Sequence, residues 1–388
     1  MSYENNHYEL LNKDTVIATF DIEGEGIREQ AVNVNILQTL PFWIKSITGW
    51  ITNRSAAKHR RFVKDLLKEM QAETMSGFIA LTNCLSLQDT LWVRSADSPL
   101  TWGQVNLFEN DFSEVMTHLA FDGTGLYGKK IRTTSPELTT DGAYDKCWIR
   151  RDGRTLLLKS GSTGARNAGL EPYSEVMASK FYVEFCKGTD YNLEHYRGHT
   201  VAVCESFSDI ENGYKPISLY LEDDSTLDAL LRTIESNNCS TDMFCRILVA
   251  DSVMVNCDRH LGNFGFLVRN DDYSVASLAP AFDYNKALTP FAESKDDIDD
   301  FKDYDKYLLD RGPSIGGEYV ELAKAVLTPE MKSDLVNLKD MVLSLPDWAY
   351  DDSESYHFTR QRTEILNEVK NVQIDRILGE EKRFSFAD

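Results

Sequence analysis

The amino-acid sequence predicts an α+β fold with two lobes, a strand-rich one followed by a helical one, and an additional α/β module before them. The chain has 388 residues, which corresponds to about 2.6 average domains. Strand patterns are concentrated in residues 131–208 and helical patterns in residues 209–388. Separate runs of strands and helices are typical of α+β proteins. The predicted division is therefore an accessory module in residues 1–130, an N-lobe in residues 131–208 and a C-lobe in residues 209–388.

The composition limits the class of protein. Hydrophobic residues make up 42% of the chain, enough to bury a core, which excludes a wholly disordered protein. The formal net charge is −21, and such a surface repels a phosphate backbone, so direct nucleic-acid contact is not expected. The sequence contains no run of about 18 apolar residues and no leader-like N-terminus. We expect a cytoplasmic protein without membrane contact, whose seven cysteines are reduced.

The first 130 residues show a mixed α/β pattern. Residues 14–37 alternate apolar and polar side chains as strands do, whereas residues 56–71 have the spacing of a helix. A basic run extends along this helix and comprises Arg54, Lys58, Arg60, Arg61, Lys64 and Lys68. Such a run is typical of a solvated helix face, and contact with RNA or DNA is the less favoured interpretation.

A hairpin dominates the start of the strand-rich lobe. Two β patterns, residues 146–151 and 154–159, flank Asp152-Gly153, a dipeptide that favours a two-residue turn. Pro172 then indicates the start of a helix, because proline loses no hydrogen bond in a first turn. A further strand is predicted over residues 200–207. Lys159 therefore ends a strand and is followed by a helix.

The C-lobe is predicted from its helical spacing. Helices are expected over residues 225–236 and 241–256, and three more beyond residue 315. A short hairpin is expected within residues 265–278, around Asn270-Asp271. The acidic segment 293–305 has the composition of a solvated loop, with substrate recognition as the alternative.

The residues with the clearest chemical pattern lie on either side of this second hairpin. Asp258-Arg-His-x-x-Asn263 precedes it, and Asp283 follows it. This order and spacing match a kinase catalytic loop and its metal-binding aspartate. In phosphoryl transfer, a carboxylate accepts the proton of the acceptor hydroxyl, and hard oxygen ligands hold Mg²⁺. Asp258 has the first role in this interpretation, and Asn263 and Asp283 have the second.

A purely structural interpretation of the same motif is the alternative. Asp258 would then cap a loop, Arg259 would pair with an acid, and His260 would be a packed or hydrogen-bonded core histidine. The combined spacing of Asp258, Asn263 and Asp283 favours the catalytic interpretation. For His260 alone the structural role is favoured, although it is kept among the candidate nucleotide-binding residues.

Upstream, Lys159 and Glu175 occur in the same order along the sequence as the lysine of a kinase and its glutamate partner in the following helix. Lys159 stands at a strand end, and Glu175 stands in the helix that follows. In kinases such an ion pair holds the α- and β-phosphates of ATP. Glu171 competes with Glu175 for the second position.

Two segments compete for the phosphate-binding loop. Residues 123–129 match G-x-G-x-x-G-K, but a helical pattern precedes them, whereas a kinase loop lies between two strands. Residues 138–143 lie directly before the hairpin that ends in Lys159 and are therefore favoured. Backbone donors there can bind phosphate, with a surface turn as the alternative. The predicted loop residues are Thr140, Asp141, Gly142 and Ala143.

These motifs resemble the HipA-like serine/threonine kinases of bacterial toxin–antitoxin systems. The resemblance covers Thr139 to Asp283 and extends through the helices to about residue 380. It implies that Asp258 is the catalytic aspartate, that Asn263 and Asp283 bind Mg²⁺, and that the backbone around Glu205 and Phe207 holds the adenine. It also implies autophosphorylation of a hydroxyl in the loop, for which Thr139 and its neighbour Thr140 are candidates.

The predicted function is that of an ATP- and Mg²⁺-dependent serine/threonine protein kinase with a bilobal protein-kinase-like fold. A phosphatidylinositol-type lipid kinase is one alternative, because those enzymes share the Asp-Arg-His-x-x-Asn loop. A catalytically idle pseudokinase or toxin-like binding module is the other. An antitoxin-type regulator is a candidate partner, and DNA contact is expected from such a basic partner rather than from this acidic chain. No motif encodes the phosphate acceptor.

Overall fold

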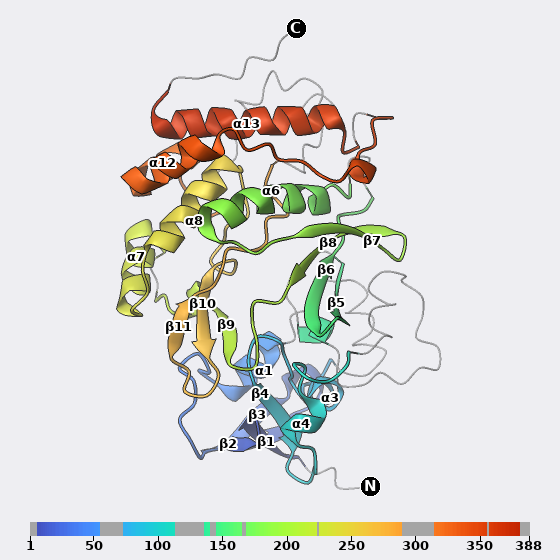
Figure 1. Ribbon diagram of the computed structural model, residues 1–388. Coiled ribbons are helices and arrows are strands. Elements are labelled where there is room, and N and C mark those ends of the chain that lie inside the picture. Colours follow the sequence, from blue (N-terminus) through green and yellow to red (C-terminus); the bar gives the residue numbers. More distant parts are fainter. Residues whose placement is uncertain are drawn as a thin grey trace. The chain divides into compact units, whose positions relative to one another are not determined.

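The computed structural model describes residues 6–54, 73–112, 136–139, 145–164, 168–222, 225–288, 314–354 and 357–380 (Figure 1). The chain is a mixed α+β protein and forms two compact units. The first comprises Met1–Leu158, Ser208–Tyr214 and Leu267–Ala276. The second comprises Lys159–Phe207, Lys215–Phe266 and Ser277–Asp388. No helix within the described ranges is long and apolar enough to cross a membrane.

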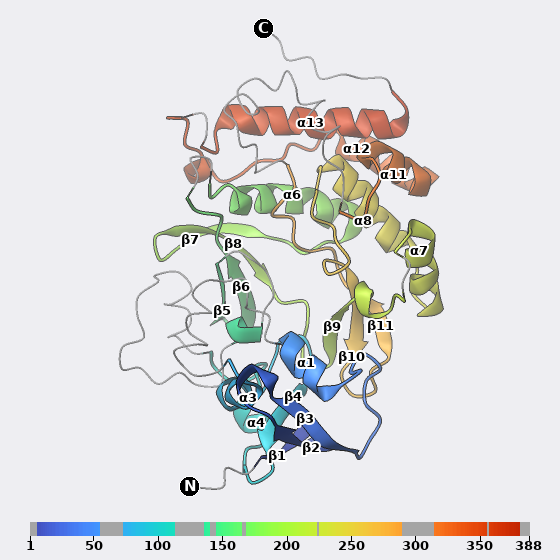
Figure 2. The same cartoon turned by 180° about the vertical axis from the view of Figure 1, so that it is seen from behind.

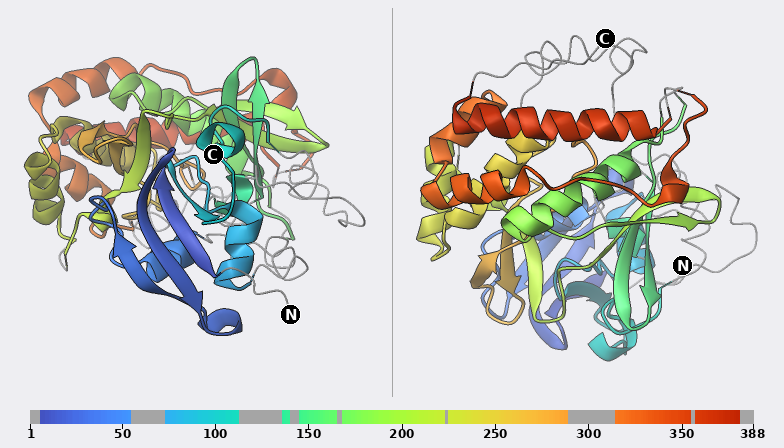
Figure 3. Two further views of the ribbon diagram at one scale, coloured as in Figure 1. Left: turned by 90° about the horizontal axis from the view of Figure 1, so that it is seen from below. Right: turned by 45° about the horizontal axis from the view of Figure 1, so that its top comes forward.

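The first unit contains a four-stranded sheet of order β3-β2-β1-β4, seen from below in Figure 3, left. Its strands are β1 (His7–Asn12), β2 (Thr15–Glu23), β3 (Gln30–Ile36) and β4 (Leu91–Ser95). β1 pairs antiparallel with both β2 and β4, and β2 pairs antiparallel with β3. The predicted strand pattern of residues 14–37 is thus confirmed. The predicted helix 56–71 and the segment 123–129 lie outside the described residues.

Apolar side chains cover one face of this sheet. Leu10, Phe20 and Val93 are buried with Phe78 and Ile79 of α3. From Ala18 to Glu23 along β2, buried positions alternate with less buried ones, which is the period of two expected for a half-buried strand. The described α-helices of the unit are α1 (Ile47–Arg54), α3 (Met75–Thr82) and α4 (Trp102–Val105).

The predicted hairpin is formed by β5 (Lys146–Arg151) and β6 (Arg154–Lys159). Asp152 and Gly153 both have positive φ, 53° and 75°. A two-residue turn with positive φ at both positions matches the twist of the strands, which is why Asp-Gly is favoured there. Lys159 is the last residue of β6, as expected.

Six α-helices are described in the second unit. α13 contacts α8 and lies above it in Figures 1 and 2. α8 also contacts α6 and α11, and the right view of Figure 3 shows α12 beside α13. The three helices predicted beyond residue 315 are confirmed as α11, α12 and α13, whereas the acidic segment 293–305 lies outside the described residues. The helices are α6 (Glu171–Cys186), α7 (Leu227–Ser236), α8 (Asp242–Val253), α11 (Tyr319–Val326), α12 (Pro329–Leu338) and α13 (Arg360–Leu378).

α6 begins with Pro172 in its first turn, as predicted. α8 is shorter than the predicted 241–256 and ends at Val253. The reason is that Val255 has a φ of 51°, in the left-handed region, where a helix cannot continue and a β-branched residue is rare. This change of direction begins the loop that contains Asp258.

The remaining strands are short. β7 (Asn192–Tyr196) pairs antiparallel with β8 (His199–Glu205), so the strand predicted over 200–207 ends at Glu205. β9 (Asn212–Pro216), β10 (Gly265–Arg269) and β11 (Val275–Leu278) form a sheet of order β11-β10-β9, which confirms the hairpin predicted within residues 265–278. The 3₁₀ helices are η1 (Gly26–Arg28), η3 (Pro136–Thr139), η4 (Ile217–Leu219) and η5 (Asp347–Ala349).

Candidate active site

A lysine and two carboxylates from distant parts of the sequence meet in the second unit. The Nζ atom of Lys159 lies 2.6 Å from Oε1 of Glu175 and 2.6 Å from Oδ1 of Asp283. Lys159 ends β6, Glu175 lies in α6, and Asp283 follows β11. The Glu175 side chain is 1% exposed, whereas that of Asp283 is 27% exposed. The cluster therefore has a buried end and a solvent-accessible end.

The geometry decides between the two glutamates that the sequence left open. Glu175 accepts hydrogen bonds from Lys159 and from the backbone N–H of Tyr284 (3.2 Å). Glu171 lies one turn earlier in α6, and its Oε2 accepts the N–H of Ser162 (3.0 Å). Residues four apart lie on the same helix face, but the described ion pair of Lys159 with α6 is to Glu175, whereas Glu171 is engaged by Ser162. The helix partner of the lysine is therefore Glu175.

The two carboxylates determine the charge of Lys159. Burial, the largest single influence, lowers the pKa of this ammonium, but Asp283 and Glu175 together outweigh burial. The pKa of Lys159 therefore lies above its ordinary value. A buried lysine is stable as a cation only when it is paired in this way. Lys159 is consequently a fixed positive charge in the site.

Arg259 connects the two segments that carry the predicted catalytic residues. Its guanidinium is fully buried, and its Nη1 donates to the carbonyl oxygen of Asn263 (2.6 Å) and to that of Phe282 (2.8 Å). One side chain thus bonds to the loop of residues 258–263 and to the residue before Asp283. Arginine suits this role because its planar group donates in several fixed directions.

Asp251 of α8 balances the charge of Arg259. It accepts two hydrogen bonds from Arg259, at 2.9 and 3.0 Å. It also accepts the hydroxyl of Tyr182 (2.6 Å) and the side-chain N–H of Asn256 (3.0 Å). The Asp251 carboxylate thus accepts four hydrogen bonds, and a buried carboxylate needs such donors to replace the water that it has lost.

The sequence interpretation did not single out Asp251 or Tyr182. A signal was available, because Asp251 is the one charged residue in a mainly apolar stretch of α8 that includes Leu248, Val249 and Val253. An acid on a buried helix face is rarely found without a cationic partner. The nearest arginine downstream is Arg259.

The loop that follows α8 positions Asp258 and Asn263. The side-chain Nδ2 of Asn263 donates to the backbone carbonyl of Asp258 (3.0 Å), and His260 N–H donates to the same carbonyl (2.8 Å). The Asp258 carboxylate is 20% exposed, and its Oδ1 lies 2.8 Å from Nζ of Lys286. The ring of His260 is exposed, and its Nδ1 accepts the N–H of Gly262 (3.0 Å), so this histidine is not a core residue.

The donor atoms fit a hard divalent cation. The Nδ2 of Asn263 is used within the loop, which leaves its side-chain carbonyl oxygen as the group available to a ligand. Asp283 offers a carboxylate that is partly exposed. Magnesium sites commonly use one or two carboxylates together with substrate phosphates. Within the described part of the chain, no three His, Cys, Asp or Glu side chains form a metal cluster by themselves.

The residues predicted to hold the adenine lie at the end of β8. Glu205 is its last residue and is exposed. The ring of Phe207 lies 5.1 Å from that of Phe282, measured between centroids. Phe282 immediately precedes Asp283, so Phe207 contacts the segment that carries the candidate metal ligand. The predicted role of Glu205 and Phe207 in holding adenine stays a prediction.

Of the predicted phosphate loop 138–143, the structure describes Leu138 and Thr139. Thr139 lies in η3, is 7% exposed, and donates its hydroxyl to the carbonyl oxygen of Leu85 (2.8 Å). Its hydroxyl would have to leave this bond before it could accept a phosphoryl group. Thr140, Asp141, Gly142 and Ala143 lie outside the described residues.

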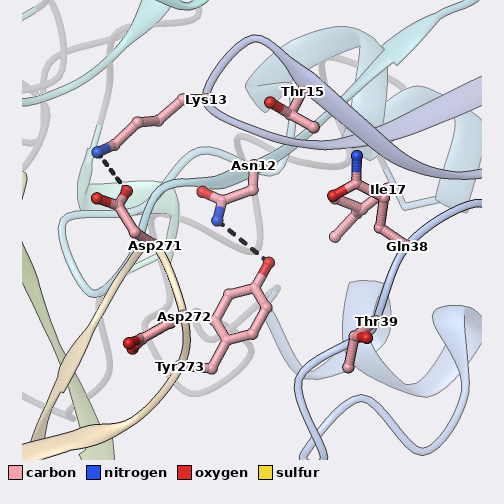
Figure 4. A pocket seen from close by; sticks show the side chains of 9 residues that line it. All are labelled: Asn12, Lys13, Thr15, Ile17, Gln38, Thr39, Asp271, Asp272 and Tyr273. Atoms are coloured by element: carbon pink, nitrogen blue, oxygen red, sulfur yellow. Dashed lines mark hydrogen bonds and ion pairs between the residues drawn. The ribbon is translucent and has the colours of Figure 1, made fainter.

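A pocket of about 430 Å³ lies elsewhere, within the first unit (Figure 4). Two pairs of its polar side chains meet: Lys13 lies 2.7 Å from Asp271, and Asn12 donates to the hydroxyl of Tyr273 (3.1 Å). No residue of the second unit lines this pocket. None of the predicted site residues that the structure describes lines it.

No family model matches this chain, and no curated protein matches it. One similar solved structure is CtkA, a proinflammatory kinase of Helicobacter pylori, with 17% identity over 60% of this chain and 92% of that chain, and a TM-score of 0.46. Another is HipA of the Shewanella oneidensis MR-1 toxin–antitoxin system, solved with HipB and its operator DNA, with 10% identity over 96% of this chain and 98% of that chain, and a TM-score of 0.49. Both TM-scores lie below 0.5.

Proposed function

We propose that this chain is an ATP- and Mg²⁺-dependent kinase that transfers the γ-phosphate of ATP to a serine or threonine hydroxyl of a protein. The main support is the contact of Lys159 with both Glu175 and Asp283. A lysine at a strand end, a helix glutamate and an aspartate beyond a hairpin are the parts that a kinase must bring together. The proposal includes a bilobal protein-kinase-like fold with residues 131–208 as N-lobe and 209–388 as C-lobe.

Each residue has a chemical task in this proposal. Lys159 binds the α- and β-phosphates as a fixed cation, and Glu175 orients it. Asp258 accepts the proton of the acceptor hydroxyl, since its carboxylate is partly exposed. Asn263 and Asp283 hold the metal ion through oxygen atoms. When bound, Mg²⁺ neutralises phosphate charge.

Arg259 and Asp251 are positioning residues in this scheme. Their buried network holds the carbonyl oxygens of Asn263 and Phe282 within reach of one guanidinium. Asn263 is itself a candidate metal ligand, and Phe282 directly precedes Asp283. Arg259 is therefore one of the residues that fix the distance between the two loops. Rigid placement of this kind is what phosphoryl transfer demands, because little covalent chemistry is left to the protein.

The test is incubation of the full chain with ATP and Mg²⁺, alone and with a cell lysate, followed by mass-spectrometric mapping of phosphate. The proposal expects phosphorylated Ser or Thr in protein and at least a hundredfold loss of transfer in Asp258→Asn, within the range known for removing a general base. An unchanged rate in Asp258→Asn would contradict the role of this residue. Phosphate on phosphatidylinositol vesicles but on no protein would support a lipid kinase, and nucleotide binding without turnover would support a binding module.

Autophosphorylation in the 139–140 loop belongs to the same proposal. The burial of Thr139 predicts slower modification than at an exposed threonine, because its bond to Leu85 must break first. Thr139→Ala and Thr140→Ala, compared by mass spectrometry, identify the acceptor. An antitoxin-type regulator as partner stays a prediction, which co-purification from the natural source would test.

A further inference from the structure

A second ion pair, which no kinase motif of the sequence includes, lies at the candidate catalytic aspartate. Nζ of Lys286 lies 2.8 Å from Oδ1 of Asp258. The Lys286 side chain is 33% exposed, whereas that of Lys159 is 6% exposed. Lys159 is therefore buried between two carboxylates, whereas Lys286 has a partly exposed side chain beside the residue that would meet the acceptor hydroxyl.

The backbone of Lys286 is held by the same short segment that carries Asp283. Ala287 N–H donates to the carbonyl oxygen of Tyr284 (2.9 Å), and Leu288 N–H donates to that of Met254 (2.8 Å). The ring of Tyr284 stacks on that of Tyr182 with 4.0 Å between centroids. Lys286 thus extends from a turn that is anchored at both ends. Lys286 stands three positions after Asp283 in the sequence.

The negative charges around the Lys286 ammonium suggest a role for it in phosphoryl transfer. Two carboxylates, Asp258 and Asp283, are partly exposed, and an incoming triphosphate adds further negative charge. Lys159 already contacts Glu175 and Asp283. The transferred phosphoryl group carries charge on its non-bridging oxygens in the transition state, and a cation aimed at them stabilises it. Lys286 is the described lysine whose ammonium lies next to Asp258.

We propose that Lys286 is a further catalytic residue, which contacts the γ-phosphate of ATP and lies between that phosphate and Asp258. The inference rests on the proposed function and deepens it. Lys286 would bind the nucleoside triphosphate more tightly than the diphosphate, because its contact exists only when the γ-phosphate is present. It would also offset the repulsion between Asp258 and the phosphoryl group during transfer.

The decisive experiment measures binding and not only activity. Lys286→Met is compared with wild type by calorimetric titration with a non-hydrolysable ATP analogue and with ADP, each in the presence of Mg²⁺. The expected result is about a tenfold weaker affinity for the ATP analogue and an ADP affinity within about twofold of wild type, as expected for the loss of one charge-assisted contact. Lys286→Arg should restore most of the preference for the triphosphate, because it keeps the charge.

Controls separate this inference from its alternatives. Lys180→Met removes a lysine of the same unit that pairs with Asp190 on the surface, and it should change neither affinity. Thermal melting shows whether each variant folds. Equal losses for the ATP analogue and ADP, or reduced transfer with an unchanged preference for the triphosphate, would overturn the role of Lys286. If wild type binds neither nucleotide, the proposed function fails, and this inference fails with it.

Discussion

The candidate active site in the second unit and the pocket of the first unit use charged side chains in opposite ways. In the active site, Arg259 and Asp251 are at most 2% exposed and bond to each other twice. In the pocket, Lys13 is 31% exposed and its partner Asp271 is 73% exposed (Figure 4). Both are ion pairs of normal length. They differ in whether water can replace a lost partner.

The difference shows which charges the fold depends on. A buried charge without its partner costs several kcal/mol, because the interior cannot solvate it. An exposed pair contributes about 0–1 kcal/mol, because water and salt screen it. The network around Arg259 should therefore be sensitive to single changes, and the pair at Lys13 should tolerate them.

The largest effect is expected when the buried network loses its acid. Asp251→Ala leaves Arg259 without a counter-charge and should lower the free energy of unfolding by about 3–5 kcal/mol. Chemical denaturation monitored by circular dichroism measures this. Asp242→Ala is the matched control, because Asp242 lies in the same helix but is 53% exposed; it should cost at most about 1 kcal/mol. Similar losses in both variants would remove the distinction between buried and exposed pairs.

A somewhat smaller effect is expected at Lys159, and it should depend on pH. Lys159→Met removes one member of a buried cluster and should cost about 3 kcal/mol at neutral pH. Since the pKa of folded Lys159 lies above its ordinary value of 10.5, the folded state holds this proton more tightly than the unfolded state. The contribution of the cation is full below pH 10.5 and is lost as the pH rises toward the folded pKa.

The difference in unfolding free energy between wild type and Lys159→Met should therefore narrow above pH 10.5, by about 1 kcal/mol per pH unit. Denaturation at pH 9 and at pH 11 measures it. A difference that widens at high pH would mean that the two carboxylates do not stabilise the charged lysine.

A third effect is expected at Gly188, which follows α6 and lies next to Tyr284. A Cβ atom on Gly188 would lie 2.3 Å from the hydroxyl oxygen of Tyr284 and 2.9 Å from Cβ of Tyr182. Gly188→Ala should cost about 1–3 kcal/mol through overpacking and reduce activity by displacing the segment of Asp283. Gly103→Ala is the control, since a Cβ there meets nothing within 4 Å. Thermal melting and the kinase assay together test this, and two equally stable variants would contradict it.

The smallest effect is expected in the pocket. Lys13→Ala breaks only the exposed pair with Asp271 and should change the free energy of unfolding by less than about 1 kcal/mol. Raising the salt concentration should reduce even this difference, because salt screens exposed charges. A loss comparable to that of Asp251→Ala would show that the pocket depends on its charges as the active site does.

Much of the local structure was predictable because its causes are local. Asp152-Gly153 predicts its hairpin because both residues tolerate positive φ, and Pro172 predicts the start of α6 because it loses no hydrogen bond there. The shortened end of α8 was not predictable in this way. Val255 has a left-handed backbone conformation, and the residue before it, Met254, accepts a hydrogen bond from the N–H of Leu288, which is far away in the sequence.

The sequence by itself determined which residue types are available for chemistry and in which order: Lys159 at a strand end, a helix glutamate, Asp258, Asn263 and Asp283. Only the tertiary structure decided which of them meet. It pairs Lys159 with Glu175 rather than Glu171, joins Asp251 to Arg259, and brings Lys286 to Asp258. The physical reason is that an ion pair depends on distances of a few ångströms between side chains, and Lys159 and Asp283 are 124 residues apart in the chain. No local pattern encodes such a distance.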